Sequence, residues 1–183
     1  MTEGAARQYG PQAVSQLQRD LKQNRPFKSL EEEAYLSLVR TTGQLTDELA
    51  AVLKPFGLSE VQYNVLRILR GAGPDGHACS EIGARLVTRD PDVTRLLDRL
   101  EKRGLVVRSR EHADRRVVTT RVTEAGLAVL AQIDEPLHQA VQGLLGHLSR
   151  PTLEALLRTL DEARDADRRS AARSDRRPDA SST

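Results

Sequence analysis

The 183-residue chain contains no tryptophan, only two phenylalanines and three tyrosines, and a single cysteine, Cys79. One cysteine excludes a disulfide framework within the chain and suits a reducing compartment. With so few aromatic side chains, the core must be aliphatic. No apolar run approaches the roughly 20 residues that span a bilayer, and the first residues lack the apolar segment of a signal peptide. We therefore expect a cytoplasmic protein that makes no membrane contact.

Motifs of several enzyme classes are also missing. The chain has no phosphate-binding G-x-x-x-x-G-K-[ST] loop, no G-x-S-x-G and no H-E-x-x-H. His77 with Cys79, and His138 with His147, match no strong zinc spacing. Cys79 is either a buried structural residue, which we favour, or a redox-sensitive thiol at a helix N-terminus. We therefore expect that the protein is not an enzyme and that it binds neither a metal nor a cofactor.

Positive charge is concentrated in one part of the chain. The formal net charge is only +2. Residues 80–123, however, contain eleven Arg and Lys against seven Asp and Glu, which gives +4 there and −2 elsewhere. This modest excess suits a surface that faces phosphates.

The stretch from Thr88 to Val122 begins with a short basic helix. Asp90 is a favourable N-cap, Pro91 suits the first helical position, and Gly104 follows the last turn. On a helical wheel, one face is apolar and must be buried, whereas the opposite face is polar and basic. The apolar face consists of Val93, Leu96, Leu97 and Leu100, and the opposite face of Pro91, Thr94, Arg95, Asp98 and Lys102, with Asp92, Arg99 and Arg103 at its flanks.

Two β-rich segments follow this helix. Leu105–Arg110 and Val117–Val122 are rich in Val, Thr and Arg, and a charged turn at 112–116 joins them. They predict a two-stranded ribbon. A helix with a basic face beside a charged hairpin tip is typical of proteins that read two DNA grooves.

Two further helices are expected ahead of the basic one. Ser59 is a favourable N-cap for a helix over 60–70, and Gly71–Gly76 (GAGPDG) predicts a loop. Ser80 then caps a short helix, Glu81–Leu86. Two short helices joined by a few residues form a helix-turn-helix unit.

Long apolar stripes mark both ends of the chain. Ser29 is a favourable N-cap for a helix over 29–54, which carries apolar side chains at helical spacing. Residues 124–164 predict two more helices, the first kinked at Pro136. One small core cannot bury all these stripes, which predicts a homodimer formed by both ends. Beyond them we expect an N-terminal extension over 1–28 with one short helix and a disordered tail over 165–183.

Four motifs occur in a fixed order: SEIGARL at 80–86, VTRLLDRLEKRGLV at 93–106, DRR at 114–116 and VTEAG at 122–126. Together they resemble the winged helix-turn-helix of the MarR family of bacterial transcriptional regulators. In the last motif, Val122 replaces the usual Leu. The resemblance spans roughly Glu33 to Leu160.

The resemblance implies a mainly α fold with a small two-stranded β wing. The winged helix-turn-helix would occupy about 59–123, between dimerisation helices at 29–54 and 124–164. An intertwined homodimer would then bind a roughly palindromic operator in double-stranded DNA, as a transcriptional regulator and most simply as a repressor. The competing hypothesis is a winged-helix module that binds a protein partner and no DNA; the basic excess argues against it.

Arg95 and Arg99 are the strongest candidates on the basic helix, because Arg offers a rigid fork to phosphates or guanine edges. The alternative is a solvated face on which Arg95 pairs with Asp98 or Glu101. Asp98 either accepts from cytosine or holds an Arg in place, and the resemblance favours the second role. The complete set of predicted DNA-binding residues is Ser80, Arg89, Thr94, Arg95, Arg99, Asp114, Arg115 and Arg116.

The resemblance assigns the wing tip a direct role. Arg116 would enter the minor groove, Asp114 would orient it, and Arg115 would reach the backbone. The alternative is a surface turn whose charges pair among themselves.

Members of this family often release DNA when a small, frequently aromatic ligand enters a cleft beside the dimerisation helices. Such an effector need only prefer a lobe spacing that cannot fit two successive grooves. Four side chains are candidates to line the cleft, and ordinary core packing is an equally good explanation of each: Tyr35, Leu38, Tyr63 and Leu66.

Overall fold

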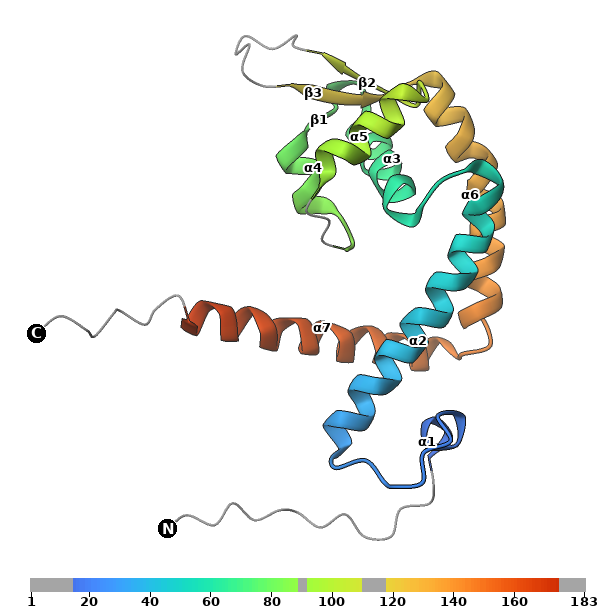
Figure 1. Cartoon of the computed structure of the whole chain (residues 1–183), viewed down its shortest axis with the longest axis vertical. Coiled ribbons are helices and arrows are strands. Elements are labelled where there is room, and N and C mark those ends of the chain that lie inside the picture. Colours follow the sequence, from blue (N-terminus) through green and yellow to red (C-terminus); the bar gives the residue numbers. More distant parts are fainter. Residues whose placement is uncertain (1–14, 89–91, 110–117, 175–183) are drawn as a thin grey trace, which may run out of the picture. The chain divides into compact units, whose positions relative to one another are not determined.

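The computed structural model describes residues 15–88, 92–109 and 118–174. These residues fall into two compact units that divide between Leu130 and Ala131, within one helix. The first unit holds the helices α1 (Gln16–Asp20), α2 (Leu30–Leu53), α3 (Glu60–Ala72), α4 (Cys79–Arg85) and α5 (Val93–Lys102), the 3-10 turns η1 (Lys54–Phe56) and η2 (Gly73–Asp75), and the strands β1 (His77–Ala78), β2 (Val106–Ser109) and β3 (Thr119–Val122). The helix α6 (Glu124–Leu145) crosses the division, and α7 (Arg150–Ser174) lies in the second unit (Figure 1).

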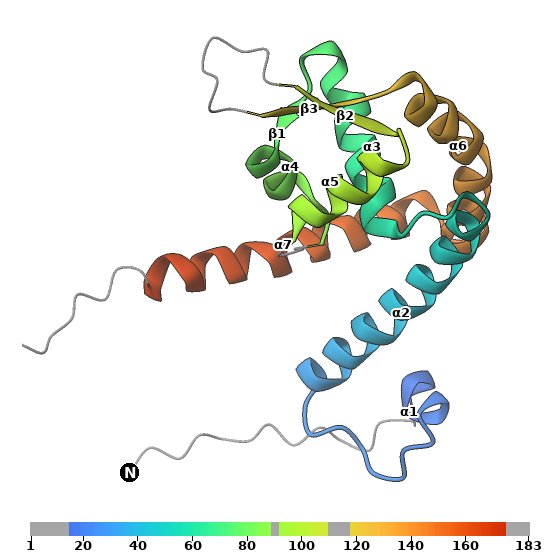
Figure 2. The same ribbon diagram turned by 45° about the horizontal axis from the view of Figure 1, so that its top comes forward.

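The sheet of the first unit has three antiparallel strands in the order β1–β3–β2. The helices α3, α4 and α5 lie on one side of it (Figures 1 and 2). The predicted pair is confirmed, with Val106 opposite Val122 and Ser109 opposite Thr119. This mainly α, winged helix-turn-helix arrangement agrees with the predicted fold class.

The third strand is a correction to the predicted two-stranded ribbon. β1 has only two residues, too few to show a periodic pattern in the sequence. The chain turns into it at Gly76, which has φ +65° and lies so close to β3 that a Cβ there would overlap the carbonyl oxygen of Thr120. Only glycine fits this turn without strain. On the other side, Arg121 Nε donates to the carbonyl of Pro74 at 2.6 Å.

An aliphatic core joins the helices to the sheet. Leu66 and Leu69 of α3, Ile82 of α4 and Leu100 of α5 have no exposed surface. Burying each such side chain stabilises the fold by about 1.5–3 kcal/mol. This agrees with the small aromatic content of the sequence.

The helix starts show which caps were predicted correctly. Ser59 accepts from the backbone N–H of Gln62, whose side chain accepts in return from the N–H of Ser59, a capping box that starts α3. Ser29 caps α2 in the predicted way through the N–H of Glu32. Both predictions are confirmed.

Two other caps differ from expectation. Asp92, and not Asp90, caps α5 by accepting from the N–H of Arg95 at 3.1 Å; Asp90 and Pro91 lie outside the described residues. Ser80 lies within the first turn of α4 and does not cap it. There the carboxylate of Glu81 accepts from the N–H of Ala78 at 2.9 Å, which holds the pKa of Glu81 below its usual range.

The N-terminal extension contains the predicted short helix, α1, capped by Ser15. Leu17 is buried, and Asp20 lies 4.0 Å from Arg40 of α2. At the other end, α7 continues to Ser174, past the predicted start of the tail at Asp165. The tail lacks large apolar residues, but Ala and Arg are strong helix formers, and extending an existing helix costs far less than nucleating one.

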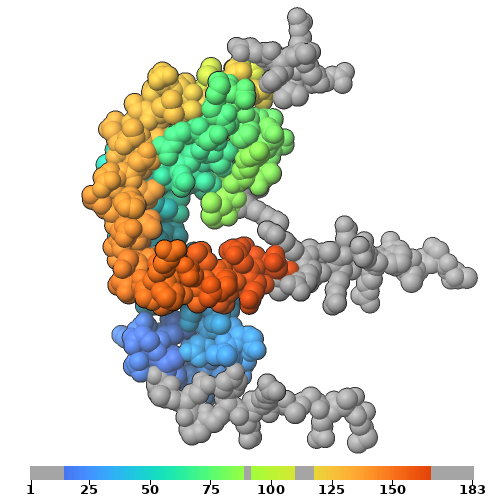
Figure 3. Space-filling model, turned by 180° about the vertical axis from the view of Figure 1, so that it is seen from behind, coloured from blue at the N-terminus to red at the C-terminus, as the bar shows by residue number. Residues whose placement is uncertain are grey.

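The second unit consists of the part of α6 from Ala131 onward together with the helix α7. The chain bends sharply between the two helices (Figure 3). Pro136 lies inside α6, as predicted. Ser149 accepts from the N–H of Thr152 at the start of α7. Among the described residues, no helix is both long and apolar enough to cross a membrane.

Candidate nucleic-acid interface

The helix α5 has one buried and one exposed face, as its sequence pattern predicts. Leu96, Leu97 and Leu100 are buried in the core, which fixes the rotation of the helix. Consequently Thr94, Arg95 and Arg99 are exposed on the opposite side. The geometry therefore offers two guanidinium groups and a hydroxyl to a partner outside the chain.

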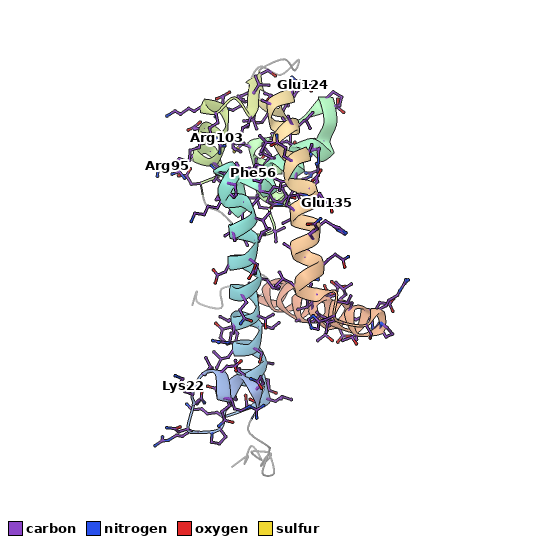
Figure 4. All side chains as sticks on the ribbon, turned by 90° about the vertical axis from the view of Figure 1, so that its right-hand side faces the viewer. Lys22, Phe56, Arg95, Arg103, Glu124 and Glu135 are labelled. Atoms are coloured by element: carbon purple, nitrogen blue, oxygen red, sulfur yellow. The ribbon has the colours of Figure 1, made fainter. Side chains whose placement is uncertain are left out.

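Arg95 is exposed to solvent and also has an ion-pair partner within the chain. Its side chain is 77% exposed, and its Nε lies 3.0 Å from Oδ2 of Asp92. The predicted alternative partners, Asp98 and Glu101, are engaged elsewhere. An exposed pair of this kind stabilises a protein little, so Arg95 can exchange Asp92 for another anion at small cost. Figure 4 shows Arg95 at the outer surface of the first unit.

The helix α4 and the turn after it support the start of α5. Ser80 is exposed in the first turn of α4. Next to it, Cys79 is only half-buried and not buried as we favoured, with its Sγ 3.8 Å from Oγ1 of Thr94. From α3, Asn64 accepts from the N–H of Val87 at 2.9 Å and so holds the turn between α4 and α5.

A cluster of three charged side chains joins α5 to the wing. The Nη2 of Arg108, on β2, lies 2.5 Å from Oδ1 of Asp98 and 2.5 Å from Oε2 of Glu101. Its Nε donates to the same Oε2 at 2.9 Å, and its backbone N–H donates to Oε1 at 3.1 Å. Asp98 thus holds an Arg, in line with the role that the resemblance favours. We call these three residues the Arg108 clamp.

The clamp shifts the titration of both partners. The hydrogen bonds from Arg108 hold the pKa of Glu101 below its usual range, and those to Glu101 and then Asp98 raise the pKa of Arg108. Glu101 and Arg108 are thereby held in their charged forms. The sequence contains a signal for part of this cluster, since Asp98 and Glu101 are three residues apart and share one helix face. Their partner, Arg108 of β2, can be identified only from the structure.

Arg103 has a structural position that sequence reasoning missed. Helical periodicity alone predicts that it lies at the flank of the basic face. In the structure its Nη1 donates to the carbonyl of Gly57 at 2.7 Å, and its Nη2 donates to that of Phe56 at 2.8 Å. Figure 4 labels Arg103 and Phe56 close together in the first unit. Arg103 therefore ties the end of α5 to the segment that follows α2.

Similarity to known proteins decides the family. The model of the MarR family matches residues 58–118. The crystal structure of a MarR transcription factor from Planctomyces limnophilus is 43% identical, has a TM-score of 0.58, and is similar over 74% of this chain and 98% of that one. This chain belongs to the MarR family of transcriptional regulators.

Two other similar proteins share a smaller fraction of identical residues with this chain. The HTH-type transcriptional repressor IacR of Pseudomonas putida is 27% identical over 124 residues, which are 68% of this chain and 73% of IacR. The structure of CouR from Rhodococcus jostii RHA1 bound to p-coumaroyl-CoA is 25% identical, has a TM-score of 0.65, and matches over 75% of this chain and 95% of CouR.

Half of the predicted DNA-binding set falls outside the described residues. These positions are Arg89, Asp114, Arg115 and Arg116. The described part of the hairpin ends where Ser109 pairs with Thr119, so β2 and β3 deliver the two sides of the MarR wing to neighbouring positions. The roles of the four residues remain predictions.

The four predicted effector residues divide into two groups. Tyr63 and Leu66 on α3 are 5% and 0% exposed, so they pack in the core. Tyr35 and Leu38 on α2 are 65% and 47% exposed in the single chain. Within the ranges that the structure describes, no three His, Cys, Asp or Glu side chains gather into a possible metal site.

Proposed function

We propose that this MarR-family chain is a cytoplasmic homodimeric repressor that binds a palindromic operator in double-stranded DNA. In this proposal α5 enters the major groove, and Arg116, with Asp114 and Arg115, reads the adjacent minor groove. The observation that carries it is the exposed face of α5, where Arg95 and Arg99 face outward from a helix fixed by its buried leucines. The repressor role rests on the similarity to IacR.

The dimer is supported by apolar surface that the single chain leaves uncovered. On α2, Tyr35, Leu38 and Val39 are 65%, 47% and 52% exposed, although they lie close together on one helix. On α7, Leu156 and Leu157 are 38% and 60% exposed. Such apolar faces usually mark an interface, and a twofold axis explains why both ends of the chain carry them.

A small-molecule effector belongs to the same proposal. CouR, which is 25% identical, was solved with p-coumaroyl-CoA bound. In this chain the exposed Tyr35 and Leu38 are the better candidates to contact an effector, because Leu66 has no accessible surface. A ligand that favours an unsuitable lobe spacing would release the DNA.

Selection of binding sites from a randomised pool of duplex DNA tests this function. The full chain is expected to enrich an inverted repeat whose half-sites are centred about one helical turn, roughly 34 Å, apart. The matched control is a variant with Arg95→Ala and Arg99→Ala, which should enrich the repeat weakly or not at all. If the wild-type chain enriches nothing above a protein-free control, the DNA-binding function is wrong, and a module that binds protein partners becomes the better hypothesis.

A further inference from the structure

We infer that Arg108 is a positioning residue for DNA binding, which fixes the wing to the recognition helix α5 through the Arg108 clamp. The inference rests on the proposed function, because it concerns how the two DNA-reading elements keep their spacing. It also assigns Asp98 and Glu101 a role inside the protein, since both carboxylates hold Arg108.

The geometry of Glu101 carries the first step. Its two oxygens bind different parts of one residue: Oε2 accepts from the Arg108 guanidinium, and Oε1 accepts from the Arg108 backbone N–H at 3.1 Å. A side chain of α5 is thus bonded directly to the main chain of β2. A guanidinium held by Nε and Nη2 on two carboxylates also has little rotational freedom. The strand cannot shift along α5 without breaking several charge-assisted hydrogen bonds.

The position of Arg108 in the wing carries the second step. β2 ends at Ser109, one residue beyond Arg108, and the proposed wing tip follows directly. In the sheet, Arg108 is paired with Thr120 of the neighbouring strand β3. Whatever fixes Arg108 therefore fixes the base from which both sides of the tip extend. A binding site needs its contacting groups held to within about 0.5 Å, so a loose base would misplace Arg116.

Charge carries the third step. Asp98 and Glu101 are 45% and 37% exposed on a helix that would approach phosphates. Both carboxylates would repel DNA if they were unpaired. With Arg108 between them, their charge is partly neutralised by its guanidinium, and the Arg108 side chain as a whole is only 26% exposed. Because two carboxylates already hold the Arg108 guanidinium, we expect its effect on binding to act through the residues that it holds.

Two substitutions separate positioning from charge. Arg108→Lys keeps the positive charge but cannot present two fixed donors to Oε2 of Glu101 and a third contact to Asp98, whereas Arg108→Gln loses both the charge and the fork. We expect each variant to weaken binding of the selected operator about tenfold or more, because each loses hydrogen bonds between charged groups, which contribute more than neutral ones. The readout is Kd by fluorescence anisotropy at fixed salt. Arg85→Lys, on the exposed surface of α4, is the matched control and should bind like the wild type.

Hydrogen exchange of residues 106–109 in the free protein gives a second, DNA-independent readout. Exchange should be faster in Arg108→Gln, and in Glu101→Gln if Arg108→Gln does not fold. A wild-type Kd for Arg108→Lys beside a weak Arg108→Gln would show that charge alone matters and would overturn the positioning role. If the wild-type chain binds no DNA, the proposed function is wrong. Separately, hydrogen exchange of residues 106–109 that is unchanged in both Gln variants would overturn the role of the Arg108 clamp.

Discussion

Replacing Gly126 with alanine is expected to destabilise the winged unit by about 3 kcal/mol, near the upper end for inserting a methyl group into a packed site. A Cβ at this position would overlap the carbonyl oxygen of Leu105 and lie 2.7 Å from Cγ2 of Val122. The first obstacle is backbone, so the start of α6 must move away from the wing. Urea denaturation followed by circular dichroism measures the effect as a lower transition midpoint.

The reason for this close approach is the junction at Thr123. Its Oγ1 donates to the carbonyl of Gly104 at 2.6 Å and accepts from the N–H of Gly126 at 3.1 Å. The N–H of Thr123 donates to the carbonyl of Leu105. One residue thus caps α6 and ties it to the end of α5. The VTEAG motif, which helped to identify the family in the sequence, has this packing as its physical basis.

The matched control is Gly71→Ala within α3. There an added Cβ meets nothing within 4 Å. Alanine should stabilise that helix by about 0.5–1 kcal/mol, because glycine loses more conformational freedom on folding. A Gly126→Ala variant as stable as the wild type would show that α6 and the wing do not pack as closely as the structure has them.

A charge on the exposed apolar face of α2 is expected to convert the dimer into a monomer. Leu38→Asp places a carboxylate among Tyr35 and Val39, and twofold symmetry introduces it twice in each dimer. We expect the dimer dissociation constant to rise by roughly a hundredfold or more, since an unpaired charge in an apolar interface is costly. Operator affinity should fall with it, because a monomer reaches only one half-site. Analytical ultracentrifugation gives the oligomeric state.

Gln44→Asp is the control for this substitution. Gln44 is also exposed on α2, but a helical wheel places it on the side opposite Tyr35, Leu38 and Val39. This variant should remain dimeric and bind the operator normally. If Leu38→Asp is dimeric at the same concentrations as the wild type, the α2 face is not part of the interface.

Local chemistry made much of the fold predictable from the sequence. The capping of α2 and α3 follows from Ser29 and Ser59, and the buried face of α5 follows from leucine spacing. The sequence alone cannot decide where α5 starts, because Asp90 and Asp92 are equally good N-caps by residue type, and the structure has Asp92 as the cap. The strand β1 could not be predicted, since its two residues are a strand only because Gly76 brings them against β3.

The candidate site was predictable to a smaller degree. The exposure of Arg95 and Arg99 follows from helical periodicity, which is local information. The Arg108 clamp and the bonds of Arg103 to Phe56 and Gly57 depend on tertiary packing, and Arg103 lies 46 residues from Gly57 in the sequence. A basic residue on a helical wheel can therefore face DNA or fasten the domain, and only the packed structure separates Arg95 from Arg103.

The most direct test of the account is the salt dependence of binding to duplex DNA from upstream of the chain's own gene, with the wild type and Arg116→Ala compared. The account predicts tight wild-type binding that weakens steeply as salt rises, with log Kd changing by roughly 0.9 per phosphate contact for each tenfold change in salt. Arg116→Ala should lose most of the affinity. Absence of wild-type binding to this fragment and to a randomised pool would contradict the central claim, and equal binding by both proteins would contradict the role of the wing.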